Sequence, residues 1–92
     1  MPSIGEIKKM YEVGQGRYSE YVKSIVQARR NAAAFLRVQG KTATTPILKN
    51  RKVIGMVLYD SSEKNFTWIL RKQNDKLEYY YMYRNGKIGR KF

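Results

Sequence analysis

From Thr42 onward, the chain consists of short runs of β-branched and aromatic residues separated by short polar connections. Runs of this length and composition predict β-strands. We expect strands near 43–48, 53–60, 66–72, 77–84 and 87–91. Pro46 favours an edge position for the first of them, because proline cannot donate a ladder hydrogen bond. Such short connections join neighbouring strands in antiparallel order, so the pattern predicts a meander.

The expected turns decide which side chains share a face of this sheet. We take 61–65 as a five-residue turn, Gln73–Lys76 as a four-residue turn and Asn85-Gly86 as a two-residue turn. One face then collects the apolar residues expected in the core: Met56, Leu58, Phe66, Trp68, Leu70, Tyr79, Tyr81, Tyr83, Ile88 and Phe92. A slip of one residue at either of the last two turns would exchange the two faces.

The opposite face is mixed, because an apolar strip is bordered by charged residues. The strip comprises Val57, Ile69, Tyr80 and Met82, and Arg71 is expected directly across from Glu78. Three interpretations stay open for this face. It is covered by a first helix near the N-terminus, it forms a homodimer interface, or it contacts nucleic acid.

The first forty residues favour helices. Ser3 and Glu6 have the capping-box spacing, which predicts a short helix over roughly residues 4–13. A longer helix is expected between a cap at Ser19 and a stop at Gly40, with Lys23, Arg30 and Arg37 along one face. The predicted fold class is therefore α+β, with two N-terminal helices packed on one face of a 4–5-stranded antiparallel meander.

We expect a single domain over residues 1–92, divided into a helical half (3–40) and a sheet half (42–92). A winged-helix-like arrangement is the alternative. In that arrangement the longer helix would enter a DNA groove through Lys23, Gln27, Arg30, Asn31 and Arg37.

The net charge is the main functional signal. Nineteen Lys and Arg against seven Asp and Glu give a formal charge of +12. An excess of this size disfavours the compact state and indicates a polyanionic partner, with nucleic acid ahead of an anionic membrane or an acidic protein. The sequence contains neither Cys nor His, which excludes disulfides, thiol and imidazole catalysis and the usual zinc sites. We expect no cofactor and no metal.

No apolar run is long enough to span a membrane, and the N-terminus lacks an apolar signal segment. These features predict a cytoplasmic protein without a membrane partner.

In the expected meander, the turns at 49–52 and 73–76 and the last basic residues gather at one end of the sheet, as phosphate contacts require. The candidate nucleic-acid-binding residues are Lys23, Arg30, Arg37, Lys49, Asn50, Arg51, Lys52, Arg71, Lys72, Lys76, Tyr80, Arg90 and Lys91.

These residues predict a small non-catalytic protein that binds duplex DNA, with a homodimer possible. RNA or single-strand binding through exposed rings, with Tyr59 and Tyr80 as candidates, is the alternative. In size, basicity and element order alone, the chain also resembles RelE-type ribonuclease toxins. That resemblance implies RNA cleavage without histidine, for which the residues to mutate are Arg71, Tyr80, Arg84, Arg90 and Lys91.

Overall fold

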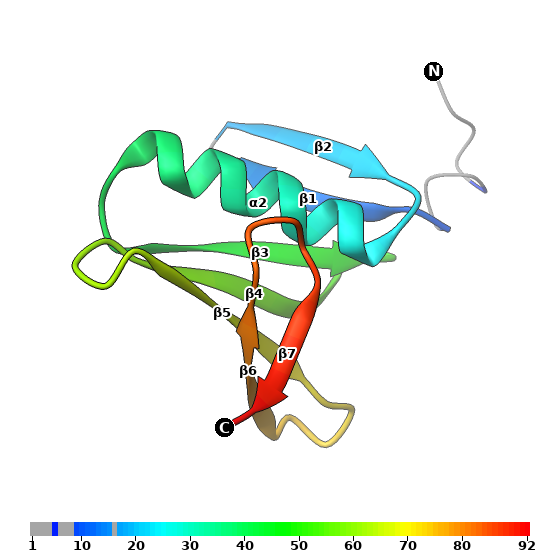
Figure 1. The fold of residues 1–92 in the computed structure, drawn as a ribbon. Helices are drawn as coiled ribbons and strands as arrows, with labels where there is room; N and C mark the ends of the chain where they lie inside the picture. The colour runs from blue at the N-terminus through cyan, green and yellow to red at the C-terminus, as the bar shows by residue number, and fades with distance from the viewer. Residues whose placement is uncertain (1–4, 6–8, 16) are drawn as a thin grey trace.

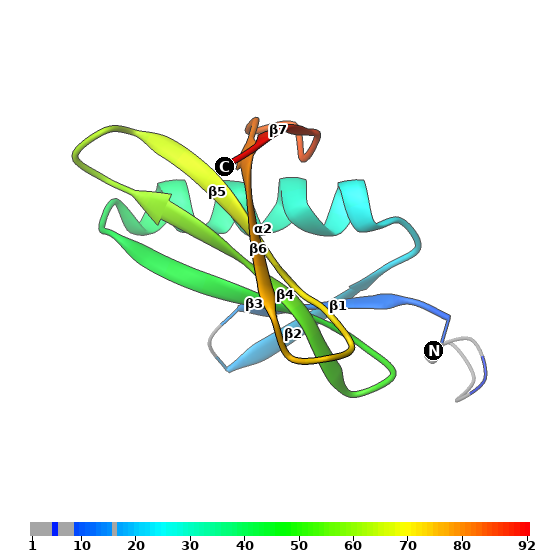
Figure 2. The same cartoon turned by 90° about the horizontal axis from the view of Figure 1, so that it is seen from below.

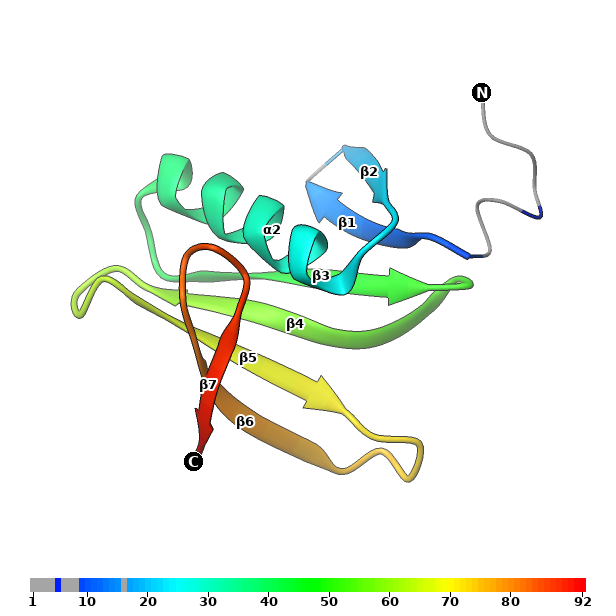
Figure 3. The same cartoon turned by 45° about the vertical axis from the view of Figure 1, so that its right-hand side comes forward.

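A seven-stranded antiparallel sheet and one long helix make up the fold in the computed structural model, which describes residues 5, 9–15 and 17–92. The sheet order is β2-β1-β3-β4-β5-β6-β7. The bounds along the chain are β1 (Tyr11–Gln15), β2 (Tyr18–Val22), α2 (Ile25–Gln39), β3 (Ala43–Lys49), β4 (Lys52–Asp60), β5 (Asn65–Arg71), β6 (Leu77–Met82) and β7 (Ile88–Lys91). The sheet curls around α2, with β1 and β2 on one side of the helix and the β6–β7 hairpin on the other (Figures 1 and 3).

The predicted fold class is wrong. The described residues contain one helix and a mostly β architecture, rather than two helices on a 4–5-stranded meander, and the winged-helix alternative fails for the same reason. The capping box at Ser3 and Glu6 lies outside the described residues, but Tyr11–Gln15 is a strand and not the end of a helix. Gly14 lies within β1, where it pairs with Ser19 of β2.

The long helix starts later than predicted and ends where predicted. Its cap is Ser24, whose hydroxyl accepts a hydrogen bond from the Gln27 N–H at 3.2 Å. Tyr18–Val22 pairs with β1 as a strand, so Ser19 does not cap a helix. At the other end Gly40 adopts the left-handed conformation (φ 70°), and its N–H donates to the Leu36 carbonyl.

Two three-residue turns set the register of the last three strands. In the first, the Lys72 N–H donates to the Lys76 carbonyl at 2.8 Å, and Asp75 has a φ of 65°. In the second, the Tyr83 N–H donates to the Lys87 carbonyl at 2.9 Å, and Gly86 has a φ of 90°. A left-handed residue that closes a three-residue loop is a common hairpin form. The first loop is one residue shorter than expected and the second is one residue longer. The pairing of the strands therefore changes by one residue.

The register change exchanges the two faces of the sheet. Trp68 pairs with Tyr80, and Phe66 with Met82, where Tyr81 and Tyr83 were expected. A four-residue turn at 61–64 shifts β4 in the same way, so Val57 and Tyr59 face the helix instead of Met56 and Leu58. We call the helix-covered side the inner face and the other the outer face; Figure 2, viewed from below, shows no described element in front of the outer face.

The core lies between α2 and the inner face. It contains Ala28, Ala32, Ala33 and Leu36 of the helix and Val13, Ile47, Val57, Phe66, Trp68 and Met82 of the sheet. Ala32 and Ala33 are fully buried in this core. In the part of the chain that the structure describes, no helix is long and apolar enough to cross a membrane.

A buried arginine fastens the β6–β7 turn to the helix. Arg29, 6% exposed, donates from Nε to the Gly86 carbonyl at 2.7 Å, and its guanidinium lies over the Trp68 ring at 5.2 Å. Burial lowers the pKa of Arg29. The hydrogen bond and the aromatic ring both compensate for the lost hydration of this cation. Arg29 thus connects the helix, the central sheet and the last hairpin.

Candidate nucleic-acid interface

Two basic hairpin tips project from the same end of the sheet, at the right in Figure 3. One is the β3–β4 tip and the other the β5–β6 tip. We call the six cations that they carry the basic end: Lys49, Arg51, Lys52, Arg71, Lys72 and Lys76. Residues of both tips, among them Lys52 and Lys72, line a common recess of about 130 Å³. The two tips are therefore neighbours, as the sequence predicted.

The β3–β4 tip is a two-residue turn with an unusual composition. Lys49 pairs with Lys52, and the two central residues, Asn50 and Arg51, have φ values of 51° and 64°. Positive φ at both positions defines a tight turn that favours Asn-Gly. Arginine at the second position carries a steric cost of about 1 kcal/mol or more. The tip therefore keeps a cation where glycine would fit the backbone better.

We expect Arg51→Gly to raise the free energy of unfolding by about 0.5–1 kcal/mol, because it removes this strain. The same change should weaken nucleic-acid binding, because it removes a cation from the tip. Thermal unfolding and a binding titration of the same protein measure the two effects. Arg84→Gly is the control, since the backbone of Arg84 does not have positive φ and glycine there brings no relief. A loss of stability in Arg51→Gly would contradict this interpretation.

Several cations of the basic end are already engaged. Arg71 donates from Nε and Nη2 to the Asp75 carboxylate, at 3.1 and 2.9 Å. Lys72 lies 3.7 Å from Glu78, and the Lys49 ammonium lies over the Tyr11 ring at 4.9 Å. Within the described part of the chain, Arg51, Lys52 and Lys76 have no carboxylate within ion-pair distance. These three are the cations most available to phosphates.

Glu78 organises the adjoining part of β6 and β7. Its carboxylate accepts hydrogen bonds from Lys91 Nζ at 2.7 Å and from the Tyr80 hydroxyl at 3.0 Å. The hydrogen bond from Lys91 is the main cause that lowers the pKa of Glu78, and the same bond raises the pKa of Lys91. The bond to Glu78 raises the pKa of Tyr80. Arg71 was expected directly across from Glu78, but the residue that pairs with Glu78 is Leu70.

The outer face presents aromatic rings that were expected in the core. Tyr79 is 42% exposed, Tyr81 44% and Phe92 62%. Phe92 packs edge-on against Tyr81 at 4.3 Å, and the Arg90 guanidinium lies over Tyr81 at 5.7 Å. We call Tyr79, Tyr81 and Phe92 the outer rings. The expected contact ring, Tyr80, lies on the inner face and is half-buried, and Tyr59 is buried.

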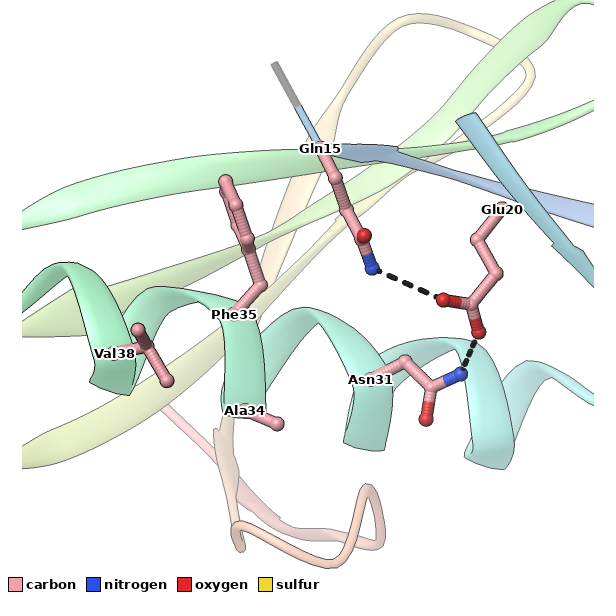
Figure 4. A pocket seen from close by; sticks show the side chains of 6 residues that line it. All are labelled: Gln15, Glu20, Asn31, Ala34, Phe35 and Val38. Atoms are coloured by element: carbon pink, nitrogen blue, oxygen red, sulfur yellow. Dashed lines mark hydrogen bonds between the residues drawn. The ribbon is translucent and has the colours of Figure 1, made fainter. Parts of the chain in front are cut away.

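The remaining predicted site residues do not join the basic end as one surface. Lys23 lies just before α2, Arg30 is exposed on the helix, and Arg37 lies in its last turn at the far end of the sheet. Asn31 donates a hydrogen bond to Glu20 beside a pocket of about 470 Å³, and Gln15 donates to the same carboxylate (Figure 4). Because Asn31 is already bonded to Glu20, this side of α2 is not an open face that could contact bases in a DNA groove.

The face proposed for a homodimer is not present as predicted. Val57 and Met82 lie in the core beneath α2, and only Ile69 of that apolar strip belongs to the outer face. The residues implied by the ribonuclease resemblance are also separated. Arg84 lies at the sheet end opposite Arg71, and Tyr80 lies on the other face from Arg71. Among the described residues, no cluster of carboxylates could hold a metal ion.

Comparisons of the chain with protein-family models, with the curated proteins and with the solved structures gave no significant match.

Proposed function

We propose that this chain is a non-catalytic nucleic-acid-binding protein that contacts the phosphates of duplex DNA with its basic end. The observation that carries the proposal is the convergence of two basic hairpin tips at one end of the sheet. Cations clustered on one surface neutralise phosphates and release their counterions, which supplies most of the affinity for DNA. The net charge of +12 adds attraction over a longer range.

The shape of the β3–β4 tip favours a duplex. A two-stranded antiparallel ribbon that ends in a two-residue turn is narrow enough to enter the major groove of B-DNA. Asn50 stands at the tip between basic residues, so an amide that can pair with an adenine edge would enter first. The β5–β6 tip would then contact the backbone beside the groove.

Single-strand binding is the second candidate, and the outer rings favour it. Unpaired bases stack on exposed aromatic side chains, at about 1–3 kcal/mol per base. Tyr79 and Tyr81 are two residues apart on one strand, so their rings share a face, and Arg90 adds a cation beside them. In this mode a single nucleic-acid strand would lie along the outer face of β6.

One titration distinguishes the two modes. A 5′-hydroxyl duplex and its separate strands are titrated with the wild type and with Tyr79→Thr/Tyr81→Thr, in which threonine keeps the strand propensity. We expect tighter binding of the duplex, with duplex affinity unchanged in the variant. The second candidate would instead be established if the wild type binds the single strand more tightly than the duplex. In that case the variant should lower the affinity for the single strand by about tenfold or more. No binding of either probe would refute both.

A further inference from the structure

A second group of cations lies at the end of the sheet opposite the basic end. Arg37 comes from the last turn of α2, Lys64 from the β4–β5 turn and Arg84 from the β6–β7 turn. All three line one pocket of about 540 Å³. The proposed function uses none of these side chains.

The electrostatics of this pocket suit a dianion. No carboxylate lines it, and among the described residues none of its three cations has an ion-pair partner. Asp60, the last residue of β4, is occupied by the turn that follows it. Its carboxylate accepts hydrogen bonds from the Ser62 hydroxyl at 2.7 Å and from the Ser62 and Glu63 N–H groups, which lower its pKa. Arginine is the side chain best shaped to bind phosphate oxygens in pairs.

Apart from Asn65, the rest of the pocket is apolar and aromatic. Its floor contains Tyr59, Phe66 and Met82, all buried, with the first two rings 5.0 Å apart. At the rim, Tyr83 is 61% exposed, and its ring lies close to the backbone of Gly89. An exposed ring supported from behind offers a surface on which a planar base can stack. The volume is within the usual range for small-molecule sites.

We infer that this pocket binds a nucleoside phosphomonoester, with the phosphate between Arg37, Lys64 and Arg84 and the base against Tyr83. An inorganic anion would use only the cations, and an apolar ligand only the floor. A nucleotide uses both. The same chemistry has two sources, a free mononucleotide and the 5′-phosphate at the end of a strand. The inference is independent of the proposed function, because it involves a different end of the sheet.

The test is a nuclear magnetic resonance titration of the ¹⁵N-labelled chain with 5′-AMP, adenosine and inorganic phosphate as separate probes. We expect saturable shifts at Lys64 and Arg84, with AMP bound at least about tenfold more tightly than either fragment. Arg37→Gln/Arg84→Gln should weaken AMP binding by about tenfold or more, whereas Arg51→Gln/Lys52→Gln should leave it unchanged. All four positions are exposed, so both variants should keep the wild-type fold, which their spectra report.

A second arm compares 5′-phosphorylated and 5′-hydroxyl forms of one oligonucleotide. A gain in affinity from the phosphate that disappears in Arg37→Gln/Arg84→Gln identifies strand ends as the source. AMP binding without such a gain identifies the free nucleotide. The inference is overturned if AMP binds no more tightly than adenosine or inorganic phosphate and the 5′-phosphate does not raise the affinity for the oligonucleotide. It is also overturned if both glutamine variants lose AMP affinity equally. Binding of 5′-hydroxyl duplex at the basic end would still stand in that case.

Discussion

Replacing Gly86 by alanine is expected to lower the free energy of unfolding by about 3–5 kcal/mol, a large part of the stability of a domain this size. A methyl group at this position would lie 2.1 Å from the Val26 carbonyl oxygen and 2.9 Å from the Arg30 nitrogen. The φ of 90° is unfavourable for any residue with a Cβ. The turn would have to move away from α2 and break the buried hydrogen bond from Arg29.

Gly40→Ala is the matched control for this prediction. Gly40 also has a positive φ, of 70°, but a methyl group there would meet no atom within 4 Å. Alanine should therefore cost only about 1 kcal/mol, the price of the backbone conformation. Thermal unfolding of the two variants measures the difference, which should exceed about 10 °C in Tm. Equal Tm values would show that the β6–β7 turn does not pack on the helix as described.

Reversing two charges at the β3–β4 tip is expected to weaken duplex binding by at least about tenfold at low salt. The change is Arg51→Glu/Lys52→Glu. These two cations have no carboxylate partner among the described residues, so their removal breaks no ion pair and leaves the fold intact. Each glutamate also adds repulsion toward a neighbouring phosphate. Fluorescence anisotropy with a 5′-hydroxyl duplex measures the loss.

Lys64→Glu/Lys87→Glu is the control, because it changes the net charge by the same amount at the other end of the sheet. Long-range attraction alone would weaken binding equally in both variants. A local interface predicts that the control loses far less affinity, about threefold or less. Similar losses would mean that the basic end is not a distinct binding surface.

The positions of the strands were readable from the sequence, and their registers were not. Five predicted strands correspond to β3–β7 with bounds within about two residues, because polar turns separate them clearly. Register depends on whether a loop has an odd or an even number of residues. Asp75 and Gly86 each close a three-residue loop in the left-handed conformation. Asn85-Gly86 fits a two-residue turn equally well, so the sequence could not decide between them.

The first hairpin was missed for a related reason. Tyr18–Val22 and Tyr11–Gln15 contain β-branched and aromatic residues, but their spacing also fits one helical face. Pairing with β3 through Val13 and Ile47 decides in favour of strands, and such long-range contacts are not visible in a local pattern.

The candidate site was recovered in part. The convergence of the two basic tips followed from strand order alone, which the register error does not affect. The outer rings were missed because face assignment does depend on register, so Tyr79 and Tyr81 were placed in the core and Tyr80 outside. The pocket at Arg37, Lys64 and Arg84 was missed because its residues come from three distant segments. If Gln73–Asp75 had been taken as a three-residue turn, Tyr79 and Tyr81 would have been assigned to the exposed face.

The salt dependence of duplex binding tests the central claim most directly. The logarithm of the association constant is measured against the logarithm of salt concentration, with wild type and Arg51→Glu/Lys52→Glu on one 5′-hydroxyl duplex. The basic end predicts a wild-type slope between about −3 and −5, since each phosphate contact contributes about −0.9, and a slope shallower by about 2 in the variant. A wild-type slope near zero, or the same steep slope in both proteins, would contradict the account.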